Sequence, residues 1–324
     1  MFDLATTTVD LATSAHLLLL TFGLTKKLKD MKIIVTGSLG HIGKPLTQLL
    51  VQKGHEVTVI SSKPERQKDI EALGAKAAIG SVEDVDFLTA IFTGADVVHT
   101  MIPPDGAAGD PIVYSQKVGS NYARAIQQSG VKRVVHVSSY GAELEKGAGL
   151  IVLQRHVEHL LDKLPLESLT FLRATYIYYN LYRFVDMIRN AGFIASNYGG
   201  DDRVVLVSPV DIAAAAADEI ENQAPGNHVR YVASDERTCN EIAAALGAAI
   251  GKPDLKWQLI SDEEMQGAYE GFGIPAHIAQ LFVEMFAACH TGLLNEGYGH
   301  HKPELGKVKL EDFAKEFATV YNAK

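Results

Sequence analysis

From residue 31 onward, short apolar runs rich in β-branched residues alternate with longer segments in which apolar side chains recur at helical spacing. This alternation is typical of βαβ units on a parallel sheet, whose strands are buried on both faces. Most of the helical segments end in glycine, which favours helix termination. The pattern predicts an α/β fold with a doubly wound parallel sheet of Rossmann type. The predicted strands are residues 32–36, 56–60, 75–79, 97–101, 133–138 and 169–173.

The rhythm changes after about residue 180, where helical segments predominate. Several of these segments follow Ser, Thr or Pro, as helices with N-terminal signals do. Two short apolar runs, at residues 203–208 and 228–234, predict further strands. We therefore expect a nucleotide-binding Rossmann domain over residues 31–180 and a smaller, mostly helical substrate-binding region over residues 181–324, packed tightly together.

Residues 1–30 precede the first predicted strand and need a separate interpretation. The apolar run at residues 16–24 has acidic residues before it and lysines after it, the reverse of a secretory signal. It is also shorter than the roughly 20 apolar residues that span a bilayer. We interpret residues 1–30 as an N-terminal extension outside the native domain structure. A packing helix and an interfacial anchor are the alternatives.

Composition and charge exclude several classes of function. With 47% apolar and 21% charged residues, the chain can bury a full core. A formal net charge of −9 disfavours binding to phosphate backbones, and no basic run provides a nucleic-acid footprint. The two cysteines, Cys239 and Cys289, provide neither a disulfide framework nor zinc-ligand spacing. We expect a cytoplasmic protein that binds neither nucleic acid nor membrane.

Three glycines between the first predicted strand and the first predicted helix carry the clearest chemical signal. Gly37, Gly40 and Gly43 form the pattern GxxGxxG. In this position the first glycine permits a tight turn, the second lets the backbone approach a pyrophosphate, and the third lets helix and strand pack closely. Free N–H groups at the start of the helix then bind the anion. The motif predicts a dinucleotide site, with a purely structural turn as the alternative.

The end of the second predicted strand indicates which nicotinamide cofactor binds. Sites that prefer NAD usually place a carboxylate there for the ribose hydroxyls, and none is present. The sequence "SSKPER" instead provides Ser62, Lys63 and Arg66, whose hydroxyl and cations suit a 2′-phosphate. We therefore expect NADP(H) to be preferred over NAD(H). The alternative is that the two cations are ordinary solvated charges, a reading that Glu65 supports.

With these residues in place, the chain from residue 31 almost to its end resembles the NmrA-like branch of the atypical short-chain dehydrogenases/reductases. Members of that family bind NAD(P)(H) and divide into reductases of quinones, dyes or other small electrophiles and redox-sensing regulators without turnover. The resemblance rests on the motifs "VTGSLGHIG", "GADVVHTMIPP", "NYARAIQQSGVKRVVHVSS", "LTFLRATYIYYN", "LVSPVDIAAAAADEI", "ASDERTCNEIAAALGAAIGKP" and "ISDEEMQGAYEGFGIP".

The resemblance also implies positions for the cofactor. The pyrophosphate would be surrounded by Gly37, Leu39, Gly40, His41, Ile42 and Gly43. Ser62, Lys63 and Arg66 would hold the adenosine phosphate, and Ser81 and Val82 would flank the adenine where relatives often have Gly-Asp. Met101, Ile102 and Pro103 would pass beside the ribose and nicotinamide. Asn121 matches a residue near the active site of extended relatives, or is a solvent-facing helix residue.

The catalytic pair of ordinary short-chain reductases is missing. Those enzymes use a Tyr and a Lys four residues later, and the lysine lowers the pKa of the phenol that passes a proton to a carbonyl oxygen. The matching positions here are Leu150 and Gln154. This departure argues against ordinary carbonyl reduction, but not against hydride transfer to a quinone. Ser139 and Tyr140, after the fifth predicted strand beside Ser138, are the candidate catalytic residues, with a structural turn as the alternative.

Aromatic residues follow the sixth predicted strand. Tyr176, Tyr178 and Asn180 are the candidate substrate contacts, because aromatic rings stack on flat molecules. Some of these tyrosines are equally suited to the core. Four histidines, His156, His159, His300 and His301, lack carboxylate or cysteine partners at ligand spacing, so we expect no metal site.

The sequence leaves three hypotheses for function. The leading one is an NAD(P)H-dependent oxidoreductase that transfers hydride to a small flat electrophile such as a quinone. The alternative is a non-catalytic NADP(H)-binding redox sensor, which would act through a protein partner, and a homodimer is compatible with either. The third is a structural subunit that retains the cofactor for stability. The missing Tyr/Lys pair favours the sensor, whereas the aromatic residues favour turnover.

Overall fold

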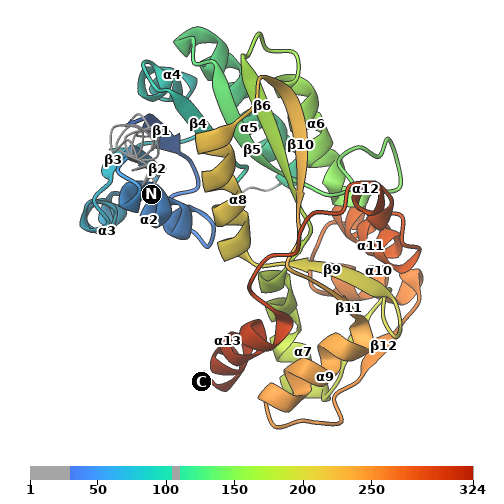
Figure 1. Ribbon diagram of the computed structural model, residues 1–324. Coiled ribbons are helices and arrows are strands. Elements are labelled where there is room, and N and C mark those ends of the chain that lie inside the picture. Colours follow the sequence, from blue (N-terminus) through green and yellow to red (C-terminus); the bar gives the residue numbers. More distant parts are fainter. Residues whose placement is uncertain (1–29, 104–109, 324) are drawn as a thin grey trace, which may run out of the picture. The chain divides into compact units, whose positions relative to one another are not determined.

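A seven-stranded parallel sheet forms the centre of the unit that begins at Met31 (Figure 1). The computed structural model describes residues 30–103 and 110–323. The strand order is β10-β6-β5-β4-β1-β2-β3, which contains the doubly wound order 3-2-1-4-5-6 and confirms the predicted fold class. The strands are β1 (Lys32–Val35), β2 (Glu56–Ser61), β3 (Lys76–Ile79), β4 (Val97–Thr100), β5 (Arg133–Ser139), β6 (Ser168–Ala174) and β10 (Gly226–Val232).

The two faces of this sheet are covered by different helices. Ile33 and Val35 of β1 belong to the core on the side of α2 and α8, whereas Ile34 belongs to the core on the side of α4, α5 and α6. Both faces are therefore buried, which explains why the strands are apolar throughout. The helices are α2 (Gly43–Gln52), α3 (Gln67–Ala72), α4 (Val85–Phe92), α5 (Pro111–Ser129), α6 (Val152–Leu161) and α8 (Pro209–Asn222), with the short 3₁₀ helices η1 (Pro64–Arg66) and η2 (Gly149–Ile151).

Local sequence signals explain where the long helices begin and end. The side chain of Asp110 accepts hydrogen bonds from the backbone of Ile112 and Val113, and Pro111 occupies the first turn of α5. Gly130 ends that helix in the left-handed conformation, at a φ of 75°. Ser208 caps α8 in the same way as Asp110 caps α5.

The remaining elements build a second core of aromatic side chains. In it Tyr178 stacks on Phe313, and Tyr198 packs against Trp257 and Phe286. The strands β7 (Tyr176–Ile177), β9 (Arg203–Val207) and β11 (Asp235–Thr238) form one small sheet, and β8 (Ile194–Ser196) pairs with β12 (Trp257–Leu259). The helices are η3 (Tyr178–Phe184), α7 (Val185–Ala191), α9 (Cys239–Ala249), α10 (Asp262–Gly271), α11 (Ala276–His290), α12 (Asn295–His300) and α13 (Leu310–Asn322).

The central sheet takes one of its strands from beyond residue 180. Strand β10 pairs in parallel with β6 along its whole length, and the preceding helix α8 packs against α2. The chain therefore forms β7 and β9 of the small sheet, returns to the central sheet with β10, and then completes the small sheet with β11 before the C-terminal helices. The expected extension, residues 1–30, lies outside the described residues except for Asp30, and so does Pro104.

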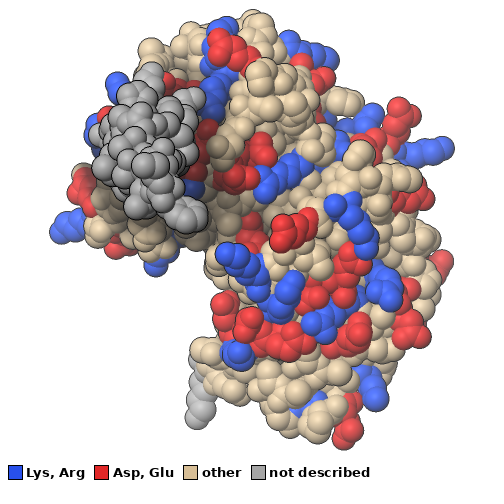
Figure 2. Space-filling view, in the orientation of Figure 1, with Lys and Arg blue, Asp and Glu red and all other residues tan. Residues whose placement is uncertain are grey.

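Two observations concern the surface and the helix lengths of the described residues. On the face drawn in Figure 2, acidic and basic side chains are interspersed over the described residues. No helix in the described ranges is both long enough and apolar enough to cross a membrane.

Candidate nucleotide and substrate site

The glycine loop between β1 and α2 has the geometry of an anion-binding turn. Gly37 has a φ of 88° and Ser38 a φ of 54°, both in the left-handed region. A Cβ at Gly43 would lie 2.2 Å from the carbonyl oxygen of Ser38, and a Cβ at Gly37 would lie 2.5 Å from the sulfur of Met101. Gly43 is therefore required by the close approach of the Ser38 backbone, and Gly37 by its left-handed φ.

The same loop presents unpaired backbone donors. In the part of the chain that the structure describes, the N–H groups of Leu39, His41 and Ile42 have no acceptor. The first turn of α2 carries no acidic side chain, so nothing there competes with an incoming anion. Free N–H groups at a helix N-terminus are the donors that bind a pyrophosphate. The residues present therefore fit a dinucleotide phosphate.

The end of β2 supports the loop and presents its cations to solvent. The hydroxyl of Ser38 donates to the Oγ of buried Ser61 over 3.0 Å, which ties the two segments together. Ser62, Lys63 and Arg66 follow on the surface, and all three are exposed. Arg66 lies 3.5 Å from Asp69, an exposed pair of the kind that contributes little to stability. These three side chains are accessible, next to the glycine loop.

The loop after β3 is held by Asn121. Its amide donates to the carbonyl oxygens of Val82 and Glu83, over 3.4 and 2.8 Å, and the residue is 8% exposed. Asn121 is thus a buried support for this loop, and the solvent-facing alternative is wrong. Ser81 and Val82 are partly buried, and the Ser81 hydroxyl accepts from the backbone of Glu83.

The end of β4 lies against the glycine loop. The backbone N–H of Met101 donates to the Thr36 hydroxyl over 3.1 Å, and its carbonyl accepts from Tyr122 over 2.8 Å. Met101 is fixed on both sides in this way, and its side chain contacts Gly37. Met101 and Ile102 line a cavity at the carboxyl ends of the strands, whereas Pro103, although partly buried, does not line it.

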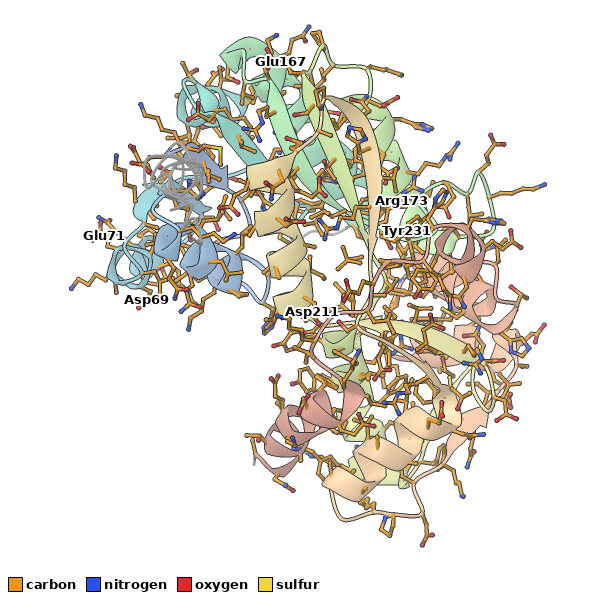
Figure 3. The ribbon with its side chains drawn as sticks, in the orientation of Figure 1. Asp69, Glu71, Glu167, Arg173, Asp211 and Tyr231 are labelled. Carbon is orange, nitrogen blue, oxygen red and sulfur yellow. The ribbon has the colours of Figure 1, made fainter. Side chains whose placement is uncertain are left out.

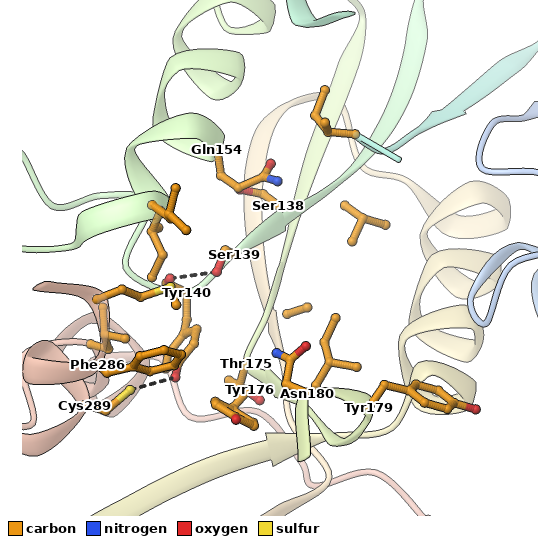
Figure 4. Close-up of a pocket in the computed structure, with 18 of the residues that line it drawn as sticks. Ser138, Ser139, Tyr140, Gln154, Thr175, Tyr176, Tyr179, Asn180, Phe286 and Cys289 are labelled. Carbon is orange, nitrogen blue, oxygen red and sulfur yellow. Dashed lines mark hydrogen bonds between the residues drawn. The ribbon is translucent and has the colours of Figure 1, made fainter. Parts of the chain in front are cut away.

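A cavity of about 610 Å³ opens at the carboxyl ends of the strands (Figure 4). Open α/β sheets bind ligands at this edge. In Figure 4 the side chains of Ser138 and Gln154 lie across the cavity from that of Asn180. Its described lining is Ile42, Met101, Ile102, Val137, Ser138, Ser139, Tyr140, Leu150, Ile151, Gln154, Ala174, Thr175, Tyr176, Ile177, Tyr179, Asn180, Arg183, Phe282, Met285, Phe286, Cys289 and Leu294.

The predicted catalytic residues Ser139 and Tyr140 both line the cavity. The Ser139 hydroxyl donates to the carbonyl oxygen of Tyr140 over 3.1 Å, and the Tyr140 hydroxyl lies 3.9 Å from the sulfur of Cys289. Burial raises the pKa of Tyr140 well above its ordinary value, and it raises that of Cys289 to about 12. Tyr140 is therefore a weak proton donor at neutral pH.

Of the predicted substrate contacts, Tyr176 and Asn180 line the cavity and Tyr178 does not. The ring of Tyr178 is 1% exposed, stacks on Phe313, and donates its hydroxyl hydrogen to the carbonyl of Val308. Contrary to the prediction, Tyr178 therefore packs in the aromatic core. It does so because the 3₁₀ helix η3 turns successive side chains in different directions.

Tyr179, the residue after Tyr178, contacts the glycine loop and also lines the cavity. Its ring stacks on that of His41, with the ring centroids 3.7 Å apart and the planes inclined by 23°. His41 is exposed and Tyr179 partly buried, so this stack lies at the surface of the site. The stack brings a residue predicted to bind pyrophosphate into contact with the lining of the cavity.

The positions of the missing catalytic pair, Leu150 and Gln154, both line the cavity. An ionic cluster that sequence reasoning did not identify centres on Arg173 of β6, beside Tyr231 of β10 (Figure 3). Arg173 donates to both carboxylate oxygens of Glu158, over 3.1 and 2.7 Å, and further to Glu143 and the hydroxyl of Tyr231. Such bidentate charge-assisted pairs fix geometry as well as charge.

Ser138 connects this cluster to the cavity. Its hydroxyl donates to Glu158 over 2.6 Å, so its remaining oxygen lone pairs are acceptors only. The side-chain oxygen of Gln154 is buried without a partner among the described residues. Ser138 and Gln154 both line the cavity, but the Gln154 oxygen is shielded from it and neither residue provides an acid or a base.

Over residues 30–103 and 110–323, no group of three or more His, Cys, Asp or Glu side chains is arranged to hold a metal ion. Cys239 and Cys289 are both buried as free thiols.

Comparison with known proteins places this geometry in a family. The model of the NmrA-like family matches residues 29–314. The chain is 25% identical, over 262 residues, to an NAD(P)H azoreductase from Xenophilus azovorans, covering 79% of this chain and 86% of that protein.

Two solved structures share the fold at 20% sequence identity. Triphenylmethane reductase from Citrobacter sp. has a TM-score of 0.73 and covers 89% of this chain, with 99% of its own length matched. An NADPH-dependent quinone oxidoreductase from Escherichia coli, solved with NADPH, has a TM-score of 0.72, covering 90% of this chain and 100% of that one. Since the family model covers nearly all of the described chain, with the glycine loop and the cavity inside the match, this protein belongs to the NmrA-like family.

Proposed function

We propose that this protein is an NADPH-dependent oxidoreductase that reduces a flat aromatic electrophile such as a quinone. The observation that carries the proposal is that one cavity joins the two halves of the site. Ile42 and Met101, beside the glycine loop, line the same cavity as Tyr176 and Phe286. A nucleotide whose pyrophosphate binds the loop would reach this cavity with its nicotinamide end.

The cofactor would be held mostly by backbone and exposed side chains. The N–H groups of the glycine loop would bind the pyrophosphate, with Ser81 and Val82 beside the adenine and Met101, Ile102 and Pro103 beside the nicotinamide ribose. Ser62, Lys63 and Arg66 would bind the 2′-phosphate, for which no carboxylate at the end of β2 competes. The names of the relatives, an NAD(P)H azoreductase and an NADPH-dependent quinone oxidoreductase, support the same assignment.

The choice of substrate class follows from what the cavity lacks. Its described acids are phenols and a thiol, and burial raises the pKa of Tyr176 to about 12 and that of Tyr179 above its ordinary value. Among the described lining residues, no group is therefore poised to protonate a carbonyl oxygen near neutral pH. When bound, NADPH supplies a hydride, so that a quinone, NADPH and one proton give a hydroquinone and NADP⁺. The proton can come from water, and the protein's part is to hold the two partners together and exclude solvent.

The test is to mix the purified protein with NADPH and a panel of benzoquinones and naphthoquinones, and to follow the loss of NADPH absorbance. We expect oxidation well above the uncatalysed rate, with NADH less effective. Aliphatic ketones should not be reduced, because the Tyr/Lys pair is absent. Reduction of ketones but not of quinones would contradict the proposal.

A redox sensor is the second candidate, and the replacement of the catalytic pair by Leu150 and Gln154 favours it. A sensor would bind NADP(H) and present a surface to a protein partner or to a second copy of the chain. Tight binding of NADPH without oxidation by any quinone of the panel would favour this candidate over the reductase.

A further inference from the structure

We infer that the substrate carries an anionic group, a sulfonate or carboxylate on its aromatic ring, and that Arg183 and Asn180 bind this group. The inference deepens the proposed function and rests on it for the identity of the site. It starts from one feature of the cavity: among its described lining residues, Arg183 is the only charged side chain.

Arg183 has no charged partner of its own. In the described chain it forms no ion pair, and its single hydrogen bond is from Nη2 to the hydroxyl of Tyr269, over 3.0 Å. The guanidinium carbon lies 4.1 Å from the ring centroid of Phe286 and 4.8 Å from that of Phe184. Aromatic faces attract a cation but leave its N–H groups unpaired. Arg183 is an exposed residue, so its remaining donors are accessible to a ligand at the cavity.

The free donors of Arg183 match the geometry of an oxyanion. A guanidinium has five N–H donors in one plane, and two of them can bind two oxygens of a carboxylate or sulfonate side by side. Because Tyr269 uses only one donor, others remain for a ligand. The planar group held over aromatic rings is also preorganised, which reduces the entropy lost on binding.

Asn180 provides a second donor on the same side. It lies three residues before Arg183 on the 3₁₀ helix η3, and side chains at i and i+3 of a 3₁₀ helix eclipse each other. Both residues line the cavity, and the side chain of Asn180 is exposed and has no hydrogen-bond partner among the described residues. An amide and a guanidinium aligned in this way can bind the same anion.

The rest of the cavity fits the remainder of such a molecule. Phe282, Met285 and Phe286 of α11 and Tyr176 provide apolar and aromatic surface for a ring. Acidic residues are absent from the described lining, so an anion meets no repulsion there. A neutral quinone would fill the same space but would leave the Arg183 donors unpaired.

The first experiment measures binding without turnover. Isothermal titration calorimetry of the full chain with NADP⁺ present compares naphthalene-2-sulfonate with 2-naphthol, which has the same ring system and no charge at neutral pH. We expect the sulfonate to bind about 10- to 100-fold more tightly, the range for hydrogen bonds to charged groups. Added salt should weaken only the sulfonate, because a partly exposed ion pair is screened.

Variants assign this preference to Arg183. R183Q should remove most of the sulfonate advantage and leave 2-naphthol unchanged, whereas R183K should keep part of it because the charge remains. R124Q is the matched control, because it removes an exposed arginine of α5 that does not line the cavity. It should bind both probes like wild type. Equal affinity of the wild type for the two probes would overturn the inference. So would a similar loss of affinity for both probes in R183Q, with no recovery in R183K, because Arg183 would then be a packing residue.

A second experiment separates the inference from the proposed function. Steady-state rates with 1,2-naphthoquinone-4-sulfonate and 1,2-naphthoquinone give the ratio of kcat/KM, which R183Q should reduce by about tenfold or more. If sulfonate binding depends on Arg183 but neither quinone is reduced, the proposed function fails and the anion site stands. If both quinones are reduced equally by wild type and R183Q, the proposed function stands and the anion site is refuted.

Discussion

Replacing His99 with methionine should stabilise this protein and make it less sensitive to acid. His99 lies in β4, in the middle of the central sheet, with 0% exposure, and neither ring nitrogen has a partner among the described residues. A neutral imidazole must carry one N–H, so one donor and one acceptor are left unpaired there. A buried unpaired donor costs about 1–3 kcal/mol. Methionine is flexible and apolar and can fill the space, so H99M should gain free energy of unfolding by about that amount near neutral pH.

The pH dependence can be worked out from the same site. Burial, together with the neighbouring His136, lowers the pKa of His99 to about 3. Burial lowers the pKa of His136 to about 4, against the opposing effects of Glu158 and Gln154. Because a histidine in the unfolded chain has a pKa near 6.5, the unfolded state binds more protons below that pH, and stability falls as the pH falls towards 4.

The loss of stability at pH 5 is a substantial fraction of the stability of a typical domain. One pKa unit corresponds to about 1.36 kcal/mol, so at pH 5, about 1.5 units below the unfolded pKa, each buried histidine costs about 2 kcal/mol. The two together cost about 4 kcal/mol, against a typical total of 5–15 kcal/mol. H99M should remove about half of this loss and leave the part due to His136.

Urea unfolding at about pH 7.5 and about pH 5, with and without the substitution, measures both effects. Titrating carboxylates contribute equally to wild type and variant, so the difference between the two proteins isolates His99. H159Q, on an exposed position of α6, is the control for removing an imidazole. If H99M and wild type lose the same stability between the two pH values, or if H99M is less stable near neutral pH, the reasoning is wrong and the imidazole has a partner such as a buried water molecule.

Two further predictions concern the nucleotide. G43A should weaken NADPH binding by at least about tenfold, as measured by calorimetry, because its Cβ would lie 2.2 Å from the Ser38 carbonyl and the loop must open; unchanged affinity would refute the pyrophosphate position. S62D should shift the ratio of NADPH to NADH affinity towards NADH, because a carboxylate repels a 2′-phosphate and can bind the ribose hydroxyls. An unchanged ratio would remove Ser62 from the phosphate pocket.

The described lining of the cavity contains no carboxyl or imidazole group, so the proposed reaction relies on positioning. The Ser138 hydroxyl donates its hydrogen bond to Glu158, and the phenols near the site are too weakly acidic to donate a proton at neutral pH. An electrophile that needs no protonation before hydride transfer suits such a site. The same lack of acid–base groups suits a sensor, which is why binding and turnover have to be measured separately.

The sequence by itself determined the central fold and the glycine loop. The predicted strands differ from the observed ones by one or two residues at their ends, because apolar runs and glycine boundaries are local properties that tertiary packing did not override. The positive φ of Gly37 and the close approach at Gly43 involve neighbours within a few residues, so the spacing of the glycines contains the information. The long amphipathic helices were readable for the same reason.

Only the tertiary structure decided which side chains line the cavity. Tyr178 and Tyr179 are neighbours in the chain, yet one packs on Phe313 and the other faces the site. The guanidinium of Arg183 lies over the ring of Phe286, which belongs to α11, about a hundred residues later in the chain. Strand β10 likewise joins a sheet whose other strands all end before residue 175. Contacts between distant segments depend on the direction each side chain takes after packing, and no local pattern of apolar and polar residues specifies that direction.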